Sequence, residues 1–221
     1  MSRLIAIGDI HGCFNRFYLL ITEIIGLTKN DKLVLLGDYI DRGPGSKEVL
    51  DFIRELVSHD YNIIPLMGNH EDMICKARDS VMDKHNWIMN GGAATMESFG
   101  AVEVSDIDGS YIDFMSNLPK YHIDGNYIFV HGGFNDDLED PFSDEFSMLW
   151  DRRFRYDSHV FKGKVIIHGH RPHALAELEE QIRNNPSVIN IDTGCVYGKE
   201  RGLGHLTGID LNNMKLYSVD C

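Results

Sequence analysis

Short apolar runs, each leading into a glycine together with Asp, Asn or His, recur along the chain. Runs of this length that are bounded by turn residues predict buried β-strands. They are Leu4–Ile7, Lys32–Leu36, Asn62–Met67, Tyr127–Val130 and Lys164–Ile167, and they lead into Gly8-Asp9, Gly37-Asp38, Gly68-Asn69, His131-Gly132 and His168-Gly169-His170. If these strands are mostly parallel, their carboxyl ends meet at one edge, which is where open α/β sheets place their sites.

The segments between the runs carry a helical period. Apolar residues from Phe14 to Ile25 recur at helical spacing, and Gly26 is placed as the C-terminal cap. Val49 to Val57 predicts a second amphipathic helix and therefore a βαβ unit. Further helices are predicted over residues 93–99 and 110–118, the second of them opened by Ser110.

The last part of the chain has a different pattern. Three β-like runs, residues 187–191, 205–210 and 215–219, follow one another without a helical segment between them, which predicts antiparallel strands. A βαβ first half followed by such a tail indicates an α/β fold, an αββα sandwich of two mixed β-sheets flanked by helices. We expect a single domain over residues 1–221, with an insertion over residues 80–120 that covers the active edge.

Composition narrows the choice of partner. The chain has 221 residues with 43% hydrophobic content, and 21 basic against 34 acidic residues give a formal net charge of −13. That charge argues against a nucleic-acid backbone or an anionic membrane as the main partner. Since no apolar run approaches the roughly 20 residues of a spanning helix and no leader pattern opens the chain, we expect a cytoplasmic protein.

The cysteines suggest no pairing. Cys13, Cys75, Cys195 and Cys221 are scattered, without the CxxC or CxH spacing of a zinc or redox motif. We therefore expect four free thiols.

The polar residues at the strand ends form a mixed oxygen and nitrogen set. The candidate ligands are Asp9, His11, Asp38, Asn69, His131 and His170. A set with several imidazoles and no thiolate suits Mn, Fe or Zn better than Mg or Ca. Asp38 is placed to bridge two cations, and two cations about 3.5–4 Å apart can hold the oxygens of an in-line displacement.

Five motifs in order carry a family resemblance. They are GDIHG (8–12), GDYIDRG (37–43), GNHE (68–71), HGG (131–133) and the Gly-His at 169–170. Together they resemble the signature of the calcineurin-like metallophosphoesterases. Arg42, the Glu after GNH and LWDR at 149–152 narrow the resemblance to the phosphoprotein phosphatase family, in particular its small bacterial and phage members, and residues 192–195 resemble a late motif of the bacterial branch.

The resemblance implies a role for each matching residue. One metal ion is held by Asp9, His11 and Asp38, and a second by Asp38, Asn69, His131 and His170. His70 is the general acid on the leaving oxygen and Asp41 orients it, while Arg42 and Arg152 hold the phosphate. The cofactor is expected to be two divalent metal ions, with manganese favoured and iron or zinc as alternatives.

Two choices within the motifs stay open. His168 and His173 are extra histidines beside His170, so the choice of His170 depends on the Gly-His register. Arg152 is preferred to Arg153 because it directly follows Trp150-Asp151.

The resemblance favours a metal-dependent phosphoprotein phosphatase. The expected substrate is a phosphorylated protein or peptide, whose serine or threonine phosphomonoester is attacked directly by a hydroxide held between the metal ions. The main alternative is a dinucleoside-polyphosphate hydrolase, for which Trp87 and Tyr197 are candidate base platforms, although both residue types are more often simply packed. A protein-tyrosine specificity stays open, while a metal-dependent binding scaffold and a nuclease are less favoured.

Overall fold

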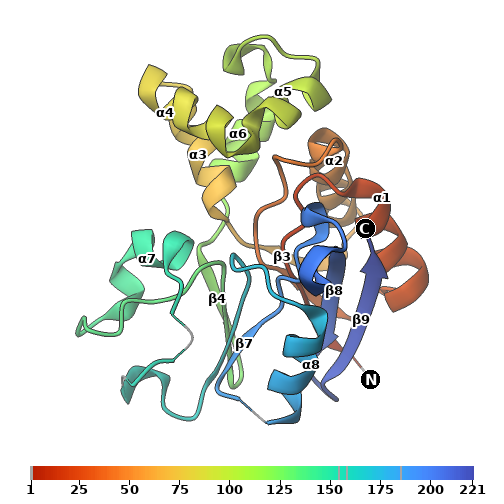
Figure 1. Cartoon of the computed structure of the whole chain (residues 1–221), viewed down its shortest axis with the longest axis vertical. Coiled ribbons are helices and arrows are strands. Elements are labelled where there is room, and N and C mark those ends of the chain that lie inside the picture. The colour runs from red at the N-terminus through yellow and green to blue at the C-terminus, as the bar shows by residue number, and fades with distance from the viewer. Residues whose placement is uncertain (1, 154, 158, 185) are drawn as a thin grey trace.

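Two β-sheets lie face to face in the computed structural model, which describes residues 2–153, 155–157, 159–184 and 186–221. One sheet has the strand order β3-β2-β1-β8-β9 and the other the order β4-β5-β6-β7. Helices flank the pair, and α3 to α6 gather at one end of the molecule (Figure 1). Two mixed sheets with flanking helices confirm the predicted αββα sandwich.

The first sheet begins as three parallel strands. β1 (Leu4–Ile7) pairs in parallel with β2 (Lys32–Leu35), and β2 pairs in parallel with β3 (Asn62–Pro65). On the other side of β1 lies the antiparallel β8 (His205–Asp210), followed by β9 (Lys215–Asp220). The carboxyl ends of β1, β2 and β3 therefore point to the same edge.

The second sheet repeats this parallel core on a smaller scale. β5 (Tyr127–Val130), β6 (Val165–His168) and β7 (Val188–Asn190) are parallel to one another, and β4 (Tyr121–Asp124) pairs antiparallel with β5. The five predicted strand ends are thus divided between two sheets.

Eight helices in the described residues surround the sheets. They are α1 (Phe14–Leu19), α2 (Ser46–Ser58), α3 (Asn69–Ala77), α4 (Val81–Trp87), α5 (Ala93–Phe99), α6 (Gly109–Ser116), α7 (Glu145–Trp150) and α8 (Leu175–Arg183). A π-helical turn, Leu20–Ile25, continues α1 and ends at Gly26, whose φ of 57° makes it the predicted left-handed cap. Where Ser110 was expected to cap α6, the cap is Asp108, whose carboxylate accepts from the Ser110 N–H.

Strand alternation explains the layers of the core. Ala6 and Val34 on one sheet and Phe129 and Ile167 on the other form one buried cluster, so these side chains fill the space between the sheets. Their sequence neighbours point the opposite way. Leu33, for example, packs with residues of α1 and α2 on the outer face.

The tail differs from the prediction at one strand. β8 and β9 are antiparallel as expected, but β7 is a parallel strand of the second sheet. The reason is the unpredicted helix α8, which lies between β6 and β7 and returns the chain so that the two strands run in the same direction.

The expectation of four free thiols is wrong for two of them. Cys195 and Cys221 form a disulfide, whereas Cys13 and Cys75 are free. The pairing joins residues 26 positions apart, in the turn after β7 and directly after β9, and no local spacing announces it.

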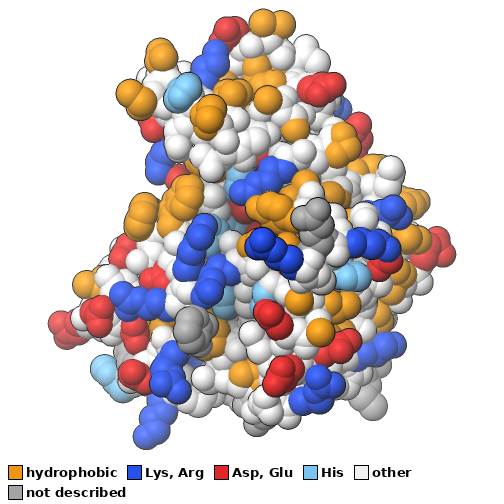
Figure 2. All heavy atoms as spheres, viewed as in Figure 1, with side chains coloured by type: hydrophobic (Ala, Val, Ile, Leu, Met, Phe, Trp, Pro, Cys, Tyr) orange, Lys and Arg blue, Asp and Glu red, His pale blue; other side chains and the backbone are white. Residues whose placement is uncertain are grey.

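Within the described residues, no helix has the length and apolar character needed to cross a lipid bilayer. A hollow separates the end formed by α3 to α6 from the rest of the surface, and histidine side chains are visible inside it (Figure 2).

Candidate active site

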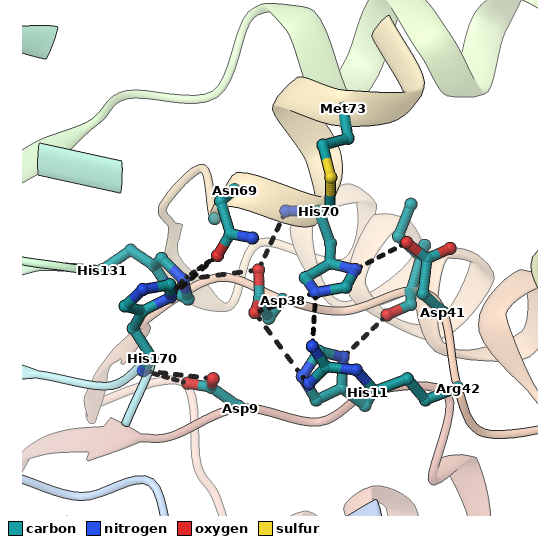
Figure 3. Close-up of polar contacts among 12 residues, drawn as sticks. Asp9, His11, Asp38, Asp41, Arg42, Asn69, His70, Met73, His131 and His170 are labelled. Atoms are coloured by element: carbon teal, nitrogen blue, oxygen red, sulfur yellow. Dashed lines mark hydrogen bonds and ion pairs between the residues drawn. The ribbon is translucent and has the colours of Figure 1, made fainter. Parts of the chain in front are cut away.

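The carboxyl ends of strands from both sheets converge on one group of polar side chains (Figure 3). Asp9 and His11 follow β1, Asp38 follows β2, and Asn69 opens α3 after β3. His131 follows β5, and His170 follows β6. The structure thus brings all six candidate metal ligands to one region, although they come from two sheets.

Several of these residues have an unusual backbone conformation. His11, Asp38, Asp41, Arg42 and His170 all have positive φ, between 45° and 71°. This left-handed region is uncommon for residues other than glycine, and such conformations cluster at functional sites. The sharp turns direct these side chains back over the strand ends.

Asp38 lies between two groups of ligand atoms. Its Oδ2 is 3.5 Å from His11 Nε2, and its Oδ1 is 3.4 Å from His131 Nε2. His11, Asp38 and His70 form one cluster whose ligand atoms lie within 4.8 Å of one another, and Asp38, His131 and His170 form another. The carboxylate therefore has the position of a bridging ligand.

In the second cluster, hydrogen-bond acceptor atoms of Asn69, His131 and His170 lie close to one another. Asn69 Oδ1 is 2.8 Å from His131 Nε2 and 2.9 Å from His170 Nδ1. His131 Nδ1 is bonded to the Leu36 carbonyl at 2.8 Å, so its Nε2 carries the lone pair. Burial lowers the pKa of His131, and it lowers the pKa of His170 to about 3, so both rings are neutral. A cation accounts for lone pairs and an amide oxygen that face each other at these distances.

His11 is arranged in the same way. Its Nδ1 is bonded to the Ile40 carbonyl at 3.0 Å, which leaves the Nε2 lone pair directed at Asp38. Ring nitrogens backed by a carbonyl are the usual second-sphere arrangement of metal-binding histidines. The residues present therefore fit a pair of divalent cations.

Asp9 lies at the edge of this group. Its two oxygens accept from the His170 backbone N–H, both at 3.1 Å. Burial, with the nearby carboxylates of Asp192 and Asp38, raises the pKa of Asp9 well above its ordinary value. Burial likewise raises the pKa of Asp192 to about 7. Since three buried carboxylates repel one another, a bound cation would stabilise their charged forms.

Asp192 is a site residue that sequence reasoning did not select. It is 3% exposed and lies beside Asp9. Its position directly after a β-strand, like those of Asp9 and Asp38, was the available signal.

His70 and Asp41 form a buried pair. His70 Nδ1 is 2.6 Å from Asp41 Oδ2, so the other nitrogen, Nε2, faces the site. Burial acts to lower the pKa of His70, but the charge of Asp38 and the bond to Asp41 outweigh it, and the pKa is raised.

Asp41 is itself fixed by the predicted insertion. Trp87 Nε1 donates to both of its oxygens, at 3.0 and 2.9 Å, and Thr95 Oγ1 donates at 2.6 Å. Trp87 is completely buried. It is therefore not available as a base platform, and its role in holding Asp41 could not be read from the sequence.

Glu71 holds the loop that carries Asp38. Its carboxylate accepts from the backbone N–H groups of Gly68 at 2.9 Å and of Asp38 and Tyr39 at 2.8 Å. The Glu after GNH thus fixes the position of Asp38.

Arginines line the opening of the site. The Arg42 guanidinium donates to His11 Nε2 at 2.6 Å, and its other terminal nitrogen lies 3.0 Å from His70 Nε2. Arg152 Nε lies 3.4 Å from His170 Nε2. Arg153 instead pairs with Asp136 and Asp137 on the outside. Of the two neighbouring arginines, the structure therefore places Arg152 at the site.

Arg42 and Arg152 share a cavity of about 210 Å³ with aromatic side chains. The other lining residues are Asp38, Asn69, Asn90, Trp150, His170, Pro172 and Tyr197. The Tyr197 ring lies 5.5 Å from the Arg42 guanidinium, and this side chain is 44% exposed. Tyr197 is thus the one of the two candidate platforms that reaches the opening.

Comparison with known families gives a match over most of the chain. Residues 2–192 match the model of the calcineurin-like phosphoesterases. This range contains all six candidate metal ligands as well as His70 and Arg152.

Individual relatives are more distant. A bis(5'-nucleosyl)-tetraphosphatase [asymmetrical] of Anoxybacillus flavithermus is 27% identical, over 96% of this chain and 92% of the relative. One of Bacillus cereus is 29% identical over the same shares. Among solved structures, a protein serine/threonine phosphatase of Saccharomyces cerevisiae has a TM-score of 0.70 at 16% identity, covering 100% of this chain and 80% of that one. At that identity the likeness shows the fold alone.

Proposed function

The chain belongs to the calcineurin-like phosphoesterase family, and on that premise we propose that it hydrolyses dinucleoside tetraphosphates such as diadenosine tetraphosphate. Relatives named for this activity match nearly the whole chain, which favours the dinucleoside-polyphosphate hydrolase over the phosphoprotein phosphatase that the motifs alone favoured. The observation that carries the proposal is Tyr197, an exposed ring beside Arg42 at the opening of the phosphate site.

The two clusters around Asp38 fit two divalent cations, and we propose manganese as the preferred metal. We assign one ion to His11 and Asp38, together with Asp9 as the family resemblance implies, and the other to Asp38, Asn69, His131 and His170. His70 also lies within the first cluster, but it is bonded to Asp41 and is assigned a different role. When bound, such a pair neutralises phosphoryl oxygens and makes an attacking water acidic enough to react near neutral pH.

The protein side chains supply the remaining steps. Arg42 and Arg152 bind the nonbridging oxygens of the phosphoryl group, because a guanidinium presents paired donors to an oxyanion. His70, held by Asp41 through Nδ1, directs Nε2 at the leaving oxygen and donates a proton there. No covalent intermediate with the protein is needed.

The surface around the hollow supports a longer anionic substrate. Lys and Arg side chains gather around the hollow in which histidines are visible (Figure 2), although the whole chain carries a formal net charge of −13. Next to Arg152, the Arg171 guanidinium donates to the Arg152 backbone carbonyl and adds a further positive charge. A tetraphosphate bridge is long enough to contact such flanking cations, whereas a single phosphomonoester contacts only the innermost ones.

A phosphoprotein phosphatase is the second candidate. The pair Arg42 and Arg152 suits a terminal phosphate, and this observation favours a phosphomonoester equally well. The two functions differ in whether anything beyond the phosphate is bound.

Replacing Tyr197 tests the proposal directly. Stacking of a base on an aromatic ring contributes about 1–3 kcal/mol, so Tyr197→Ala should raise KM for diadenosine tetraphosphate roughly 5- to 150-fold. KM for 4-nitrophenyl phosphate, which has no base, should change less than about twofold. Tyr121→Ala is the matched control, because Tyr121 is an exposed tyrosine on β4, away from the opening. If KM for the dinucleotide is unchanged in Tyr197→Ala, Tyr197 does not bind the base and no longer supports the proposed function.

A further inference from the structure

His168 and His173 flank the candidate active site without taking part in it. His168 ends β6 and is 1% exposed. Its Nδ1 is bonded to the Gly169 carbonyl at 3.0 Å, so this nitrogen carries the proton. Its Nε2 is buried and has no hydrogen-bond partner among the described residues. A buried lone pair of this kind requires a ligand or a water molecule.

His173 shares one feature with His168. Its Nε2 is likewise buried and has no hydrogen-bond partner among the described residues. Two imidazole nitrogens close together in the chain therefore need a partner that the described residues do not supply.

The two imidazoles line one small cavity with further acceptors. The cavity has a volume of about 220 Å³ and also contains Glu177 and Gln181 of α8. These two residues are four positions apart, so they lie on the same face of the helix. Gln181 Oε1 is a third buried atom without a partner in the described residues.

The lining atoms without a partner are the Nε2 atoms of His168 and His173 and Oε1 of Gln181, and Glu177 adds a carboxylate. Arg171 and Asn190 also line the cavity, but the Arg171 guanidinium donates to the Arg152 carbonyl and the Asn190 amide to the Arg171 carbonyl. A positive ligand would satisfy the atoms that have no partner. Because the His168 ring is held from behind by the Gly169 carbonyl, it also has the fixed orientation of a metal-binding histidine.

We propose that His168, His173 and Gln181 bind an additional divalent transition-metal ion, with Glu177 supplying negative charge to the cavity. Two imidazoles with oxygen donors suit zinc, cobalt or nickel better than magnesium or calcium. The site shares no ligand with the clusters around Asp38. It joins α8 to the segment between β6 and α8, which also carries His170, so the ion would fix the position of that segment. The proposal does not depend on the substrate.

Metal content tests the proposal without using activity. The full chain is stripped with a chelator, reloaded with zinc, freed of excess metal and measured by elemental analysis. His173→Ala should hold one zinc ion fewer per chain than the unmodified protein. His122→Ala is the matched control, because His122 Nε2 is also buried and unpartnered but its cavity contains no second histidine. Its zinc content should not change.

Two further variants separate this site from the dinuclear centre and from misfolding. Asp38→Asn should lose zinc from the centre while keeping the ion that depends on His173. Gln181→Leu removes only the amide oxygen and should weaken binding of that ion about tenfold or more in a zinc titration, even if His173→Ala fails to fold. Equal zinc content in the unmodified protein and His173→Ala, or equal affinity in Gln181→Leu, would mean that water fills the cavity.

Discussion

At the scale of single residues, the account depends on which nitrogen of His70 faces the substrate. Asp41 holds Nδ1, and Trp87 and Thr95 hold Asp41, so the acid is positioned by two successive layers of hydrogen bonds. Each layer of hydrogen bonds can be removed by its own substitution.

Loss of His70 should affect substrates according to their leaving group. A general acid contributes roughly 10²- to 10⁴-fold where the leaving oxygen is basic, and little where it departs without a proton. His70→Asn should therefore slow hydrolysis of phenyl phosphate far more than that of 4-nitrophenyl phosphate, measured as kcat on metal-loaded enzyme. Similar losses on both esters would contradict the acid role.

Loss of the Trp87 indole N–H should have a smaller effect of the same kind. Trp87→Phe leaves Asp41 buried with one donor fewer, which costs about 1–3 kcal/mol of folding free energy. We also expect kcat for phenyl phosphate to fall severalfold, with kcat for 4-nitrophenyl phosphate nearly unchanged. Stability is measured by denaturant unfolding, and a loss of stability with both rates unchanged would make Trp87 a packing residue only.

Site residues that stand in a local motif could be predicted from the sequence. Residues that support the site through a long-range contact could not. Asp38, His70 and Arg42 stand in local motifs directly after strands, so their sequence neighbours place them. Trp87 contacts Asp41 across 46 positions of sequence, and no pattern in either segment reports that pair.

At the scale of elements, the predicted insertion does more than cover the site. The turn between α4 and α5 contacts Arg42 directly, because Gly91 has a φ of 110° and its carbonyl accepts from the Arg42 N–H at 3.1 Å. A Cβ at position 91 would lie 2.7 Å from Arg42 Cγ. The turn therefore helps to set the position of Arg42, the side chain that we propose binds phosphate.

Gly91→Ala should accordingly impair activity as well as stability. The strained φ costs about 1–3 kcal/mol, and displacement of Arg42 should lower kcat/KM roughly tenfold. Gly100→Ala is the control: its φ is 63°, so it is also strained, but no atom lies within 4 Å of the added Cβ. Gly100→Ala should lose stability and retain activity. Equal kcat/KM in the two variants would show that the turn does not position Arg42.

Hydrophobic periodicity predicted most strands and helices, but it did not predict which strands pair with one another. The run at 187–191 reads Ser-Val-Ile-Asn-Ile, and so short a run fits either sheet. Only α8, whose apolar stripe was not recognised, determines that β7 joins β6 in parallel.

At the scale of the whole molecule, one covalent bond joins the turn after β7 to the end of β9. A disulfide that closes a loop of this size stabilises the fold by about 3 kcal/mol. Treatment with a reductant should therefore lower Tm by roughly 6–12 °C. Cys221→Ser should show the lower Tm without reductant and no further response to it, while Cys75→Ser should respond like the unmodified protein. A Tm of the unmodified protein that is insensitive to reductant would contradict a stabilising disulfide.

The joining of two sheets at one site is also a property of the whole molecule. Within each sheet the parallel strands direct their carboxyl ends to one edge, but the meeting of the two edges depends on the buried cluster between the sheets. The strand pattern predicted that the strand ends meet at one edge and that two sheets pack together, but not that this edge is shared by the two sheets.

The central claim is that the substrate is a dinucleoside tetraphosphate. The most direct test compares kcat/KM for diadenosine tetraphosphate and for a phosphothreonine peptide on the same manganese-loaded enzyme. We predict a value at least about tenfold higher for the dinucleotide, since a base and several phosphates are bound in addition to the reacting one. A higher value for the phosphopeptide, with Tyr197→Ala without effect on either substrate, would contradict the account and assign the same site to phosphoprotein hydrolysis.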